Sequence, residues 1–125
     1  NPIQKPEEVQ TLDECLALVP RSTFERHYFD ETTCNGWHLY VVDYCLSLGK
    51  LGLGVYAIPL CVYHKSRGHA TKGFFPALKN VLKKHRKCYV HVYTTNGDWS
   101  TRYPLILQRS IKFVSFIWRK AKAAI

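Results

Sequence analysis

Apolar residues recur at helical spacing in two internal stretches of the chain. In residues 37–48 they fall three and four positions apart, and the pattern stops near Gly49. In residues 72–87 apolar side chains take one side of the helical period and Lys and Arg take the other. This spacing is typical of amphipathic helices. We therefore expect helices at about 38–48 and 73–86.

Shorter apolar runs predict strands. Residues 15–19 form an apolar run that ends at Pro20, and residues 55–63 are rich in β-forming residues but interrupted by Pro59. Residues 89–93 alternate in polarity before a turn sequence at 94–97. Strands interleaved with helices indicate an α/β fold. We predict a short mixed sheet with strands near Leu16, 55–62 and Val90.

The last part of the chain has a pattern of its own. From 106 to 118 apolar residues recur at helical spacing, and Arg and Lys flank them. A basic amphipathic helix that carries Phe and Trp can lie on an anionic membrane surface. Packing against another part of the protein explains the same pattern. We therefore divide the chain into a domain at 1–103 and a basic amphipathic segment at 104–125.

Composition favours a folded protein with one domain. The chain has 125 residues, of which 46% are hydrophobic, and it has no apolar run long enough to predict a transmembrane helix. Its five cysteines include no Cys-x-x-Cys pair, so we expect reduced thiols in a cytoplasmic protein and neither a zinc module nor a disulfide framework. The absence of Met is consistent with a fragment of a longer protein.

Charge is distributed unevenly between the two halves. Residues 51–125 hold fourteen Lys and Arg but a single acid, Asp98, whereas residues 1–50 hold eight acids and four basic residues. A basic half predicts an anionic neighbour, which is a nucleic acid, a phospholipid surface or a diphosphate-bearing substrate. Charge alone leaves these three open.

Several local patterns combine acids, aromatic residues and histidine. They are L-D-E-C at 12–15, R-S-T-F at 21–24, F-D-E at 29–31, W-H-L-Y-V-V-D-Y-C-L at 37–46 and V-Y-H-K-S-R-G at 62–68. In this order and spacing they resemble the second half of the GT-A fold in family-2-like nucleotide-sugar glycosyltransferases. The resemblance covers residues 9–99 and implies a partial GT-A-like mixed sheet with flanking helices.

The resemblance also implies a chemistry. Such enzymes move a sugar from a nucleotide-diphosphate donor to a hydroxyl of a saccharide or lipid-linked acceptor, as in cell-surface polysaccharide biosynthesis. A divalent cation, Mn²⁺ or Mg²⁺, neutralises the leaving diphosphate, and a carboxylate takes the acceptor proton.

The family holds its cation mainly through an Asp-x-Asp motif, and none occurs in this chain. We therefore expect the nucleotide-binding half to lie outside it. The isolated chain is expected to be inactive, to bind nucleotide-sugar and cation weakly, and to self-associate through an uncovered apolar surface.

Residues of the last motif are candidates for the donor side of the site. By resemblance His64, at the end of a β-rich run, is the metal ligand, and Ser66 and Arg67 contact phosphate through hydroxyl and guanidinium groups. The alternative interpretation is an ordinary solvated basic turn.

Asp43 is the candidate general base, and we expect it to face a common cleft with His64. The alternative is a carboxylate that makes a helix-packing hydrogen bond. Many family members carry the carboxylate that acts as the general base two positions earlier, where this chain has Val41. Three further candidates for the base are Asp30, Glu31 and His38.

The remaining candidates belong to the acceptor side. Trp37 and His38 open the predicted helix and are expected to line the acceptor cleft, where an aromatic ring can stack on a sugar. Asp13 and Glu14 are expected to hydrogen-bond acceptor hydroxyls. The alternatives are a core or capping role for Trp37 and a solvated strand entry for the two acids.

A different class of function also fits the basic second half. The chain could be a nucleic-acid- or membrane-surface-binding module without catalysis. No named nucleic-acid motif occurs, so we do not expect nucleic acid as a partner. We expect a cytoplasmic protein with a peripheral contact at the inner membrane face.

Overall fold

The computed structural model describes residues 3–65 and 72–122, and within them four helices combine with two small antiparallel sheets. In chain order the elements are β1 (Glu7–Glu8), α1 (Arg21–Phe24), α2 (Tyr40–Lys50), β2 (Tyr56–Ala57), α3 (Phe74–His85), β3 (His91–Thr94), β4 (Gly97–Ser100) and α4 (Leu105–Lys122). The prediction of a fold that mixes helices and strands is confirmed, and α2, α3 and α4 lie where the helical periodicity predicted them.

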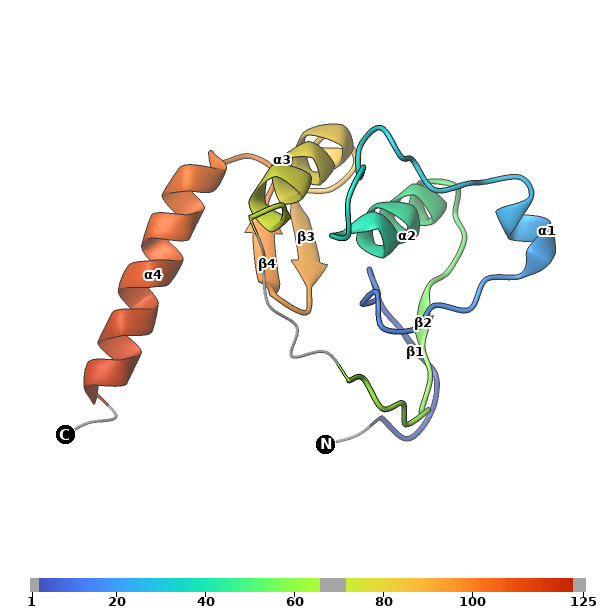
Figure 1. Ribbon diagram of the computed structural model, residues 1–125, viewed down its shortest axis with the longest axis horizontal. Coiled ribbons are helices and arrows are strands. Elements are labelled where there is room, and N and C mark those ends of the chain that lie inside the picture. The colour runs from blue at the N-terminus through green and yellow to red at the C-terminus, as the bar shows by residue number, and fades with distance from the viewer. Residues whose placement is uncertain (1–2, 66–71, 123–125) are drawn as a thin grey trace.

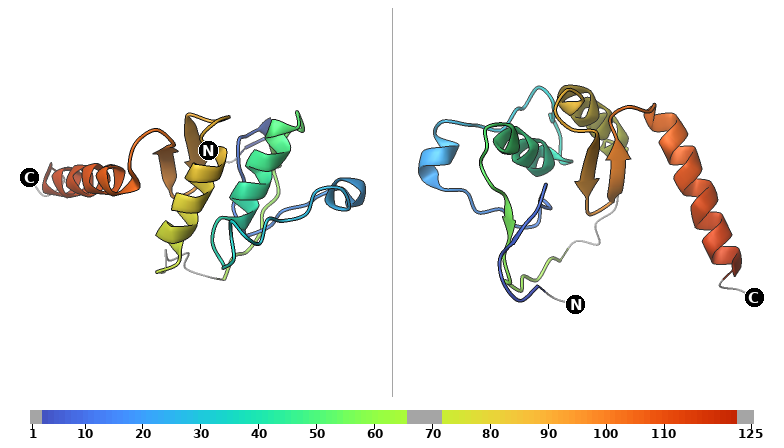
Figure 2. Two further views of the ribbon diagram at one scale, coloured as in Figure 1. Left: turned by 90° about the horizontal axis from the view of Figure 1, so that it is seen from above. Right: turned by 180° about the vertical axis from the view of Figure 1, so that it is seen from behind.

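The main core lies between α2 and α3, which run side by side in all views (Figures 1 and 2). Their facing side chains pack in one apolar cluster with two residues of the β3–β4 hairpin, Val92 and Trp99. The helical members of this cluster are Val42, Leu46, Phe74, Leu78, Val81 and Leu82, and Leu39, just before α2, joins them. The three- and four-residue spacing places these side chains on one side of each helix, so that burying them stabilises the helix pair.

The hairpin follows from local turn chemistry. β3 and β4 pair from His91 with Ser100 to Thr94 with Gly97. Gly97 has a φ of 110°, a backbone conformation that residues with a Cβ rarely adopt. The Thr94 hydroxyl donates a hydrogen bond to the Gly97 carbonyl, which closes the turn. The predicted strand at 89–93 is confirmed two residues further along the chain, with a partner strand after the turn.

The single mixed sheet that we predicted is wrong for the described residues. β1 pairs only with β2, and β3 pairs only with β4, in two separate antiparallel sheets. Residues 15–19 form no strand, because no neighbouring segment offers them a ladder of backbone hydrogen bonds. Of residues 55–62 only Tyr56 and Ala57 are paired.

The second apolar cluster lies on the other side of α2. Val41 and Cys45 pack there with Val55, and partly buried residues of the N-terminal segment complete the cluster. Consequently α2 is covered on two sides, by α3 and by the segments around β1 and β2. A central helix of this kind fixes the direction of every side chain it carries.

The C-terminal helix stands apart from this body. α4 leaves the end of β4 and extends away from α3 in every view (Figures 1 and 2). Its contacts with the body are confined to its first turns, where Leu105 packs against the main core.

Candidate functional site

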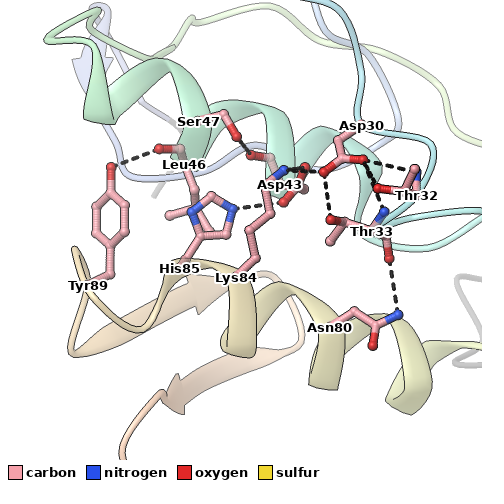
Figure 3. A network of polar contacts seen from close by, with 10 residues as sticks. All are labelled: Asp30, Thr32, Thr33, Asp43, Leu46, Ser47, Asn80, Lys84, His85 and Tyr89. Atoms are coloured by element: carbon pink, nitrogen blue, oxygen red, sulfur yellow. Dashed lines mark hydrogen bonds and ion pairs between the residues drawn. The ribbon is translucent and has the colours of Figure 1, made fainter.

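Asp43 lies at the junction of α2 and α3, with 1% of its surface exposed. One carboxylate oxygen is 2.7 Å from His85 Nε2, and the other accepts a hydrogen bond of 2.6 Å from Lys84 Nζ (Figure 3). His85 is completely buried, and its Nδ1 has no hydrogen-bond partner among the described residues. With both oxygens committed to α3, this carboxylate fastens the two helices together.

The loop before α2 joins the same network. Lys84 Nζ also lies 2.9 Å from a carboxylate oxygen of Asp30. Asp30 accepts further hydrogen bonds from the hydroxyls of Thr32 and Thr33 and from their backbone N–H groups (Figure 3). Hydrogen bonds from Thr32, then from Lys84 and Thr33, hold the pKa of Asp30 far below its ordinary value. Asp30 is therefore ionised and fully engaged.

A large cavity opens on the other side of α2. Its volume is about 580 Å³, and its lining draws on residues 12–13 and 15–20, on Thr23 and Phe29, on α2, and on the segment 53–62. α2 contributes Val41, Tyr44, Cys45 and Leu48 to this lining. All five of the motif segments recognised in the sequence thus contribute residues to one hollow, whose walls are mainly apolar.

Asp43 and His64 do not meet in this cavity. Neither residue lines it, because Asp43 points to α3 and His64 lies exposed in the segment after β2. Val41, at the position where relatives of the resembled family carry the base, does line it. Ser66 and Arg67 lie outside the described residues.

The acceptor-side candidates gather at the start of α2. Glu14 accepts a hydrogen bond from the backbone N–H of Leu39, and the electrostatic influence of nearby His38 lowers the pKa of its carboxyl group. His38 packs edge-on against Phe74, at 5.7 Å between ring centroids. Trp37, next in the chain, is 89% exposed. A carboxylate and an imidazole therefore lie near each other just before α2, and the exposed Trp37 precedes the imidazole in the chain.

The backbone at this helix end is strained. Leu39 has φ of 67°, and it is the one non-glycine residue with positive φ among the described residues. Such a conformation is costly for a residue with a branched side chain and is concentrated at functional sites. Here it turns the Leu39 N–H toward Glu14.

Glu14 has unusual electrostatics. Burial raises its pKa, the charge of Asp13 adds to the rise, and the backbone N–H groups of Glu14 and Leu39 oppose it. Its Oε1 is buried without a hydrogen-bond partner in the described part of the chain. A desolvated carboxylate with a free oxygen is a stronger base than a solvated one.

Asp13 is committed differently. One of its oxygens accepts the Cys15 backbone N–H at 3.1 Å, and the other accepts the Thr95 hydroxyl at 2.7 Å. It therefore joins the N-terminal segment to the hairpin turn, and it also lines the cavity. Of the two neighbouring acids, Glu14 keeps the free oxygen.

The described residues bring no three potential ligands together for a metal ion. His64 therefore belongs to no group of three potential ligands in residues 3–65 and 72–122, and these side chains do not by themselves fit the cation that the resemblance implies.

Sequence reasoning missed the partners of Asp43. Lys84 and His85 belong to a run of basic residues at the end of α3, and such a run is typical of a solvated face. The signal was present in the helical period, because Leu78, Val81 and His85 share one side of the helix.

Comparisons of the chain with protein-family models, with curated proteins and with solved structures find no match.

Proposed function

We propose that this chain is the acceptor-side half of a nucleotide-sugar glycosyltransferase with a GT-A-like fold, which transfers a sugar to a hydroxyl of a saccharide or lipid-linked acceptor. The observation that carries the proposal is the convergence on α2 of segments that are distant in the sequence and that hold the family-like motifs. Residues of the 12–20 and 53–62 segments and Phe29 adjoin this one helix, and Asp30 is joined to Lys84 of the neighbouring α3.

The acceptor would bind at the start of α2. Trp37 offers an exposed indole face, which suits the apolar C–H face of a sugar ring. Glu14 and His38 supply polar groups beside it that can bind hydroxyls. None of these three residues lines the large cavity, so the acceptor would bind at the surface beside the start of α2.

Glu14 is the general base in this proposal. Its Oε1 has no hydrogen-bond partner among the described residues, and burial raises the pKa of the carboxylate, which makes it a better proton acceptor. Because this oxygen is buried, the proposal requires the Glu14 side chain to turn outward when the acceptor binds. In the transfer step the acceptor hydroxyl gives its proton to Glu14 while its oxygen forms a bond to the anomeric carbon, and the nucleoside diphosphate leaves with the electron pair of the broken bond. Sequence reasoning had assigned Glu14 only to hydroxyl binding.

Asp43 is better suited to positioning than to proton transfer. Both of its oxygens are engaged by α3, and it does not line the cavity. Asp30 is excluded from the role of base for a related reason, since its hydrogen bonds stabilise the ionised form. Both residues hold α2, and with it the acceptor site, in place.

The apolar cavity supports the other part of the proposal, the missing nucleotide-binding half. Its wall includes large apolar side chains that remain exposed, among them Leu16, Leu18, Ile58 and Leu60. An apolar hollow of this size is the surface expected where a further layer of the same domain packs. Because the described residues do not assemble a metal site, we derive no step from a bound cation.

Saccharide binding by the chain itself tests the acceptor site. Saturation-transfer NMR with a panel of mono- and disaccharides should show transfer to sugar protons. Trp37→Ala should weaken this binding at least about tenfold, the scale of losing one aromatic contact. Tyr103→Ala is the matched control, because Tyr103 is also exposed but lies before α4. No transfer to any saccharide, or an equal loss in both variants, would contradict the site.

A further inference from the structure

α4 carries an apolar face that no other element of the described structure covers; within the helix, Lys122 Nζ lies 4.2 Å from the centre of the Trp118 ring. At about 100° per residue, five large apolar side chains fall within an arc of about 120°. This outer face consists of Leu107, Ile111, Val114, Ile117 and Trp118, and all five residues are exposed. Val114 is 64% and Trp118 63% exposed. Such exposure over five residues costs free energy in water unless a partner covers the face.

The outer face points away from the rest of the protein. The body contacts the opposite side of α4, where Arg109 lies 3.7 Å over the Phe75 ring and Lys112 lies 4.7 Å from the Trp99 ring. Gln108, on the same side, bonds the backbone at Ser100. These contacts orient the helix, so the direction of the outer face follows from the fold.

The far end of α4 is positively charged. Arg119, Lys120 and Lys122 are exposed in its last turns, and the helix carries no acid in its sequence. At about 100° per residue Lys120 and Lys122 fall on the two borders of the outer face. A helix with an apolar face, bordering cations and an indole has the composition of segments that lie in the headgroup region of a bilayer.

We propose that the outer face of α4 docks the protein on the surface of a bilayer that contains anionic phospholipids. The apolar side chains enter the boundary between headgroups and acyl chains, and the terminal cations contact lipid phosphates. No helix among the described residues is long and apolar enough to cross a membrane, so α4 lies along the surface.

Two other partners fit the geometry less well. Nucleic acid binds to an outward basic face, whereas α4 turns Arg109 and Lys112 toward the body and apolar groups outward. A second copy of the chain would bring two helices together that each carry five basic residues and no acid, which is electrostatically unfavourable.

The experiment measures partition of the protein onto lipid vesicles by cosedimentation. Vesicles of phosphatidylcholine with one quarter phosphatidylglycerol should bind the protein at least about tenfold more tightly than pure phosphatidylcholine. Replacing Lys120 and Lys122 together by Gln should weaken binding to the anionic vesicles by roughly 25-fold, about fivefold for each charge. Equal partition onto both vesicles, or no binding, would overturn the proposal.

The fluorescence of Trp118 provides a second readout, for which the outer face of α4 is left unchanged. Trp99 is buried and Trp37 is exposed, so Trp37→Phe leaves Trp118 as the indole that can change its solvent exposure. Its fluorescence should shift to shorter wavelength on anionic vesicles, because the ring leaves water. An unchanged spectrum in the presence of bound vesicles would show that another surface makes the contact.

Two matched double variants test the face itself. Val114→Gln with Trp118→Gln removes one aromatic and one other residue from the outer face, and should lower vesicle binding at least about tenfold. Ser115→Gln with Phe116→Gln also removes one aromatic but lies outside the outer face of α4, and should leave binding within about twofold. Neither double variant changes a charged residue, and Gln has a high helix propensity, so α4 should still form. Circular dichroism checks that it does.

Two results would assign the outer face to the competing partners. Salt-sensitive binding to a DNA or RNA duplex that is lost with Val114→Gln and Trp118→Gln would overturn the membrane proposal. The membrane proposal would also be overturned if the wild-type protein forms a dimer in analytical ultracentrifugation but does not bind vesicles, and if this double variant is a monomer.

Discussion

His85 Nε2 lies 2.7 Å from Asp43 Oδ1 in a part of the core that water does not reach, and Lys84 Nζ contacts the second oxygen of the same carboxylate. Asp43 belongs to α2, and its two partners are the last residues of α3. A charged group that is removed from water is tolerated only while its partners remain.

Asp43→Ala should therefore lower the stability of the folded protein substantially. We expect a loss of about 3–5 kcal/mol in the free energy of unfolding, the scale of breaking a buried ion pair from one side. Urea denaturation followed by circular dichroism measures this loss. Glu25→Ala is the control, since its pair with Arg21 is exposed and should contribute less than about 1 kcal/mol. Equal stability of the two variants would remove Asp43 from its structural role.

Asp30 predicts a loss of stability in acid. Hydrogen bonds from Thr32, Lys84 and Thr33 lower its pKa in the folded state below the value of 3.8 for a free side chain. The stabilisation is present above that value and is lost as the pH falls toward the lower folded pKa. Free energies of unfolding between about pH 6 and 2.5 should decline more steeply in wild type than in Asp30→Asn. Parallel curves would contradict the assignment.

Glu14 predicts the opposite dependence on pH. Burial raises its pKa, so the ionised form destabilises the folded state, and stability falls as the pH rises through the folded pKa. Glu14→Gln keeps the hydrogen-bond acceptor and removes the charge. This variant should be more stable than wild type at about pH 7 and gain little at about pH 4. Glu31→Gln, at an exposed site, should show no such difference. A Glu14→Gln protein that is less stable at neutral pH would contradict the prediction.

The helices could be predicted because their evidence is local. Val42 and Leu46 in α2, and Leu78 and Val81 in α3, each reveal the buried side of their helix within a few residues of sequence. Strand β3 and the turn after it were predicted for the same reason, because alternation and turn residues are local signals, whereas β4 was not predicted.

The failures concern pairings between distant residues. The apolar run around Leu16 has the composition of a strand, but a strand also needs a neighbour, and sequence spacing does not reveal one. The contact of Asp43 with His85 spans 42 positions. Helical spacing could place His85 on the buried side of α3, yet only the packed structure brings it to a carboxylate of α2.

Sugar transfer by the gene's own protein product, with whatever sequence precedes Asn1, tests the central proposal most directly. The assay follows release of nucleoside diphosphate from a panel of UDP-, GDP- and dTDP-sugars, with Mn²⁺ or Mg²⁺ and with saccharide and lipid-linked acceptors. We predict acceptor-dependent release with at least one donor and a decrease of at least about 100-fold in Glu14→Gln, the scale of losing a general base. No acceptor-dependent release with any donor would contradict the glycosyltransferase proposal, and full activity in Glu14→Gln would contradict its choice of base.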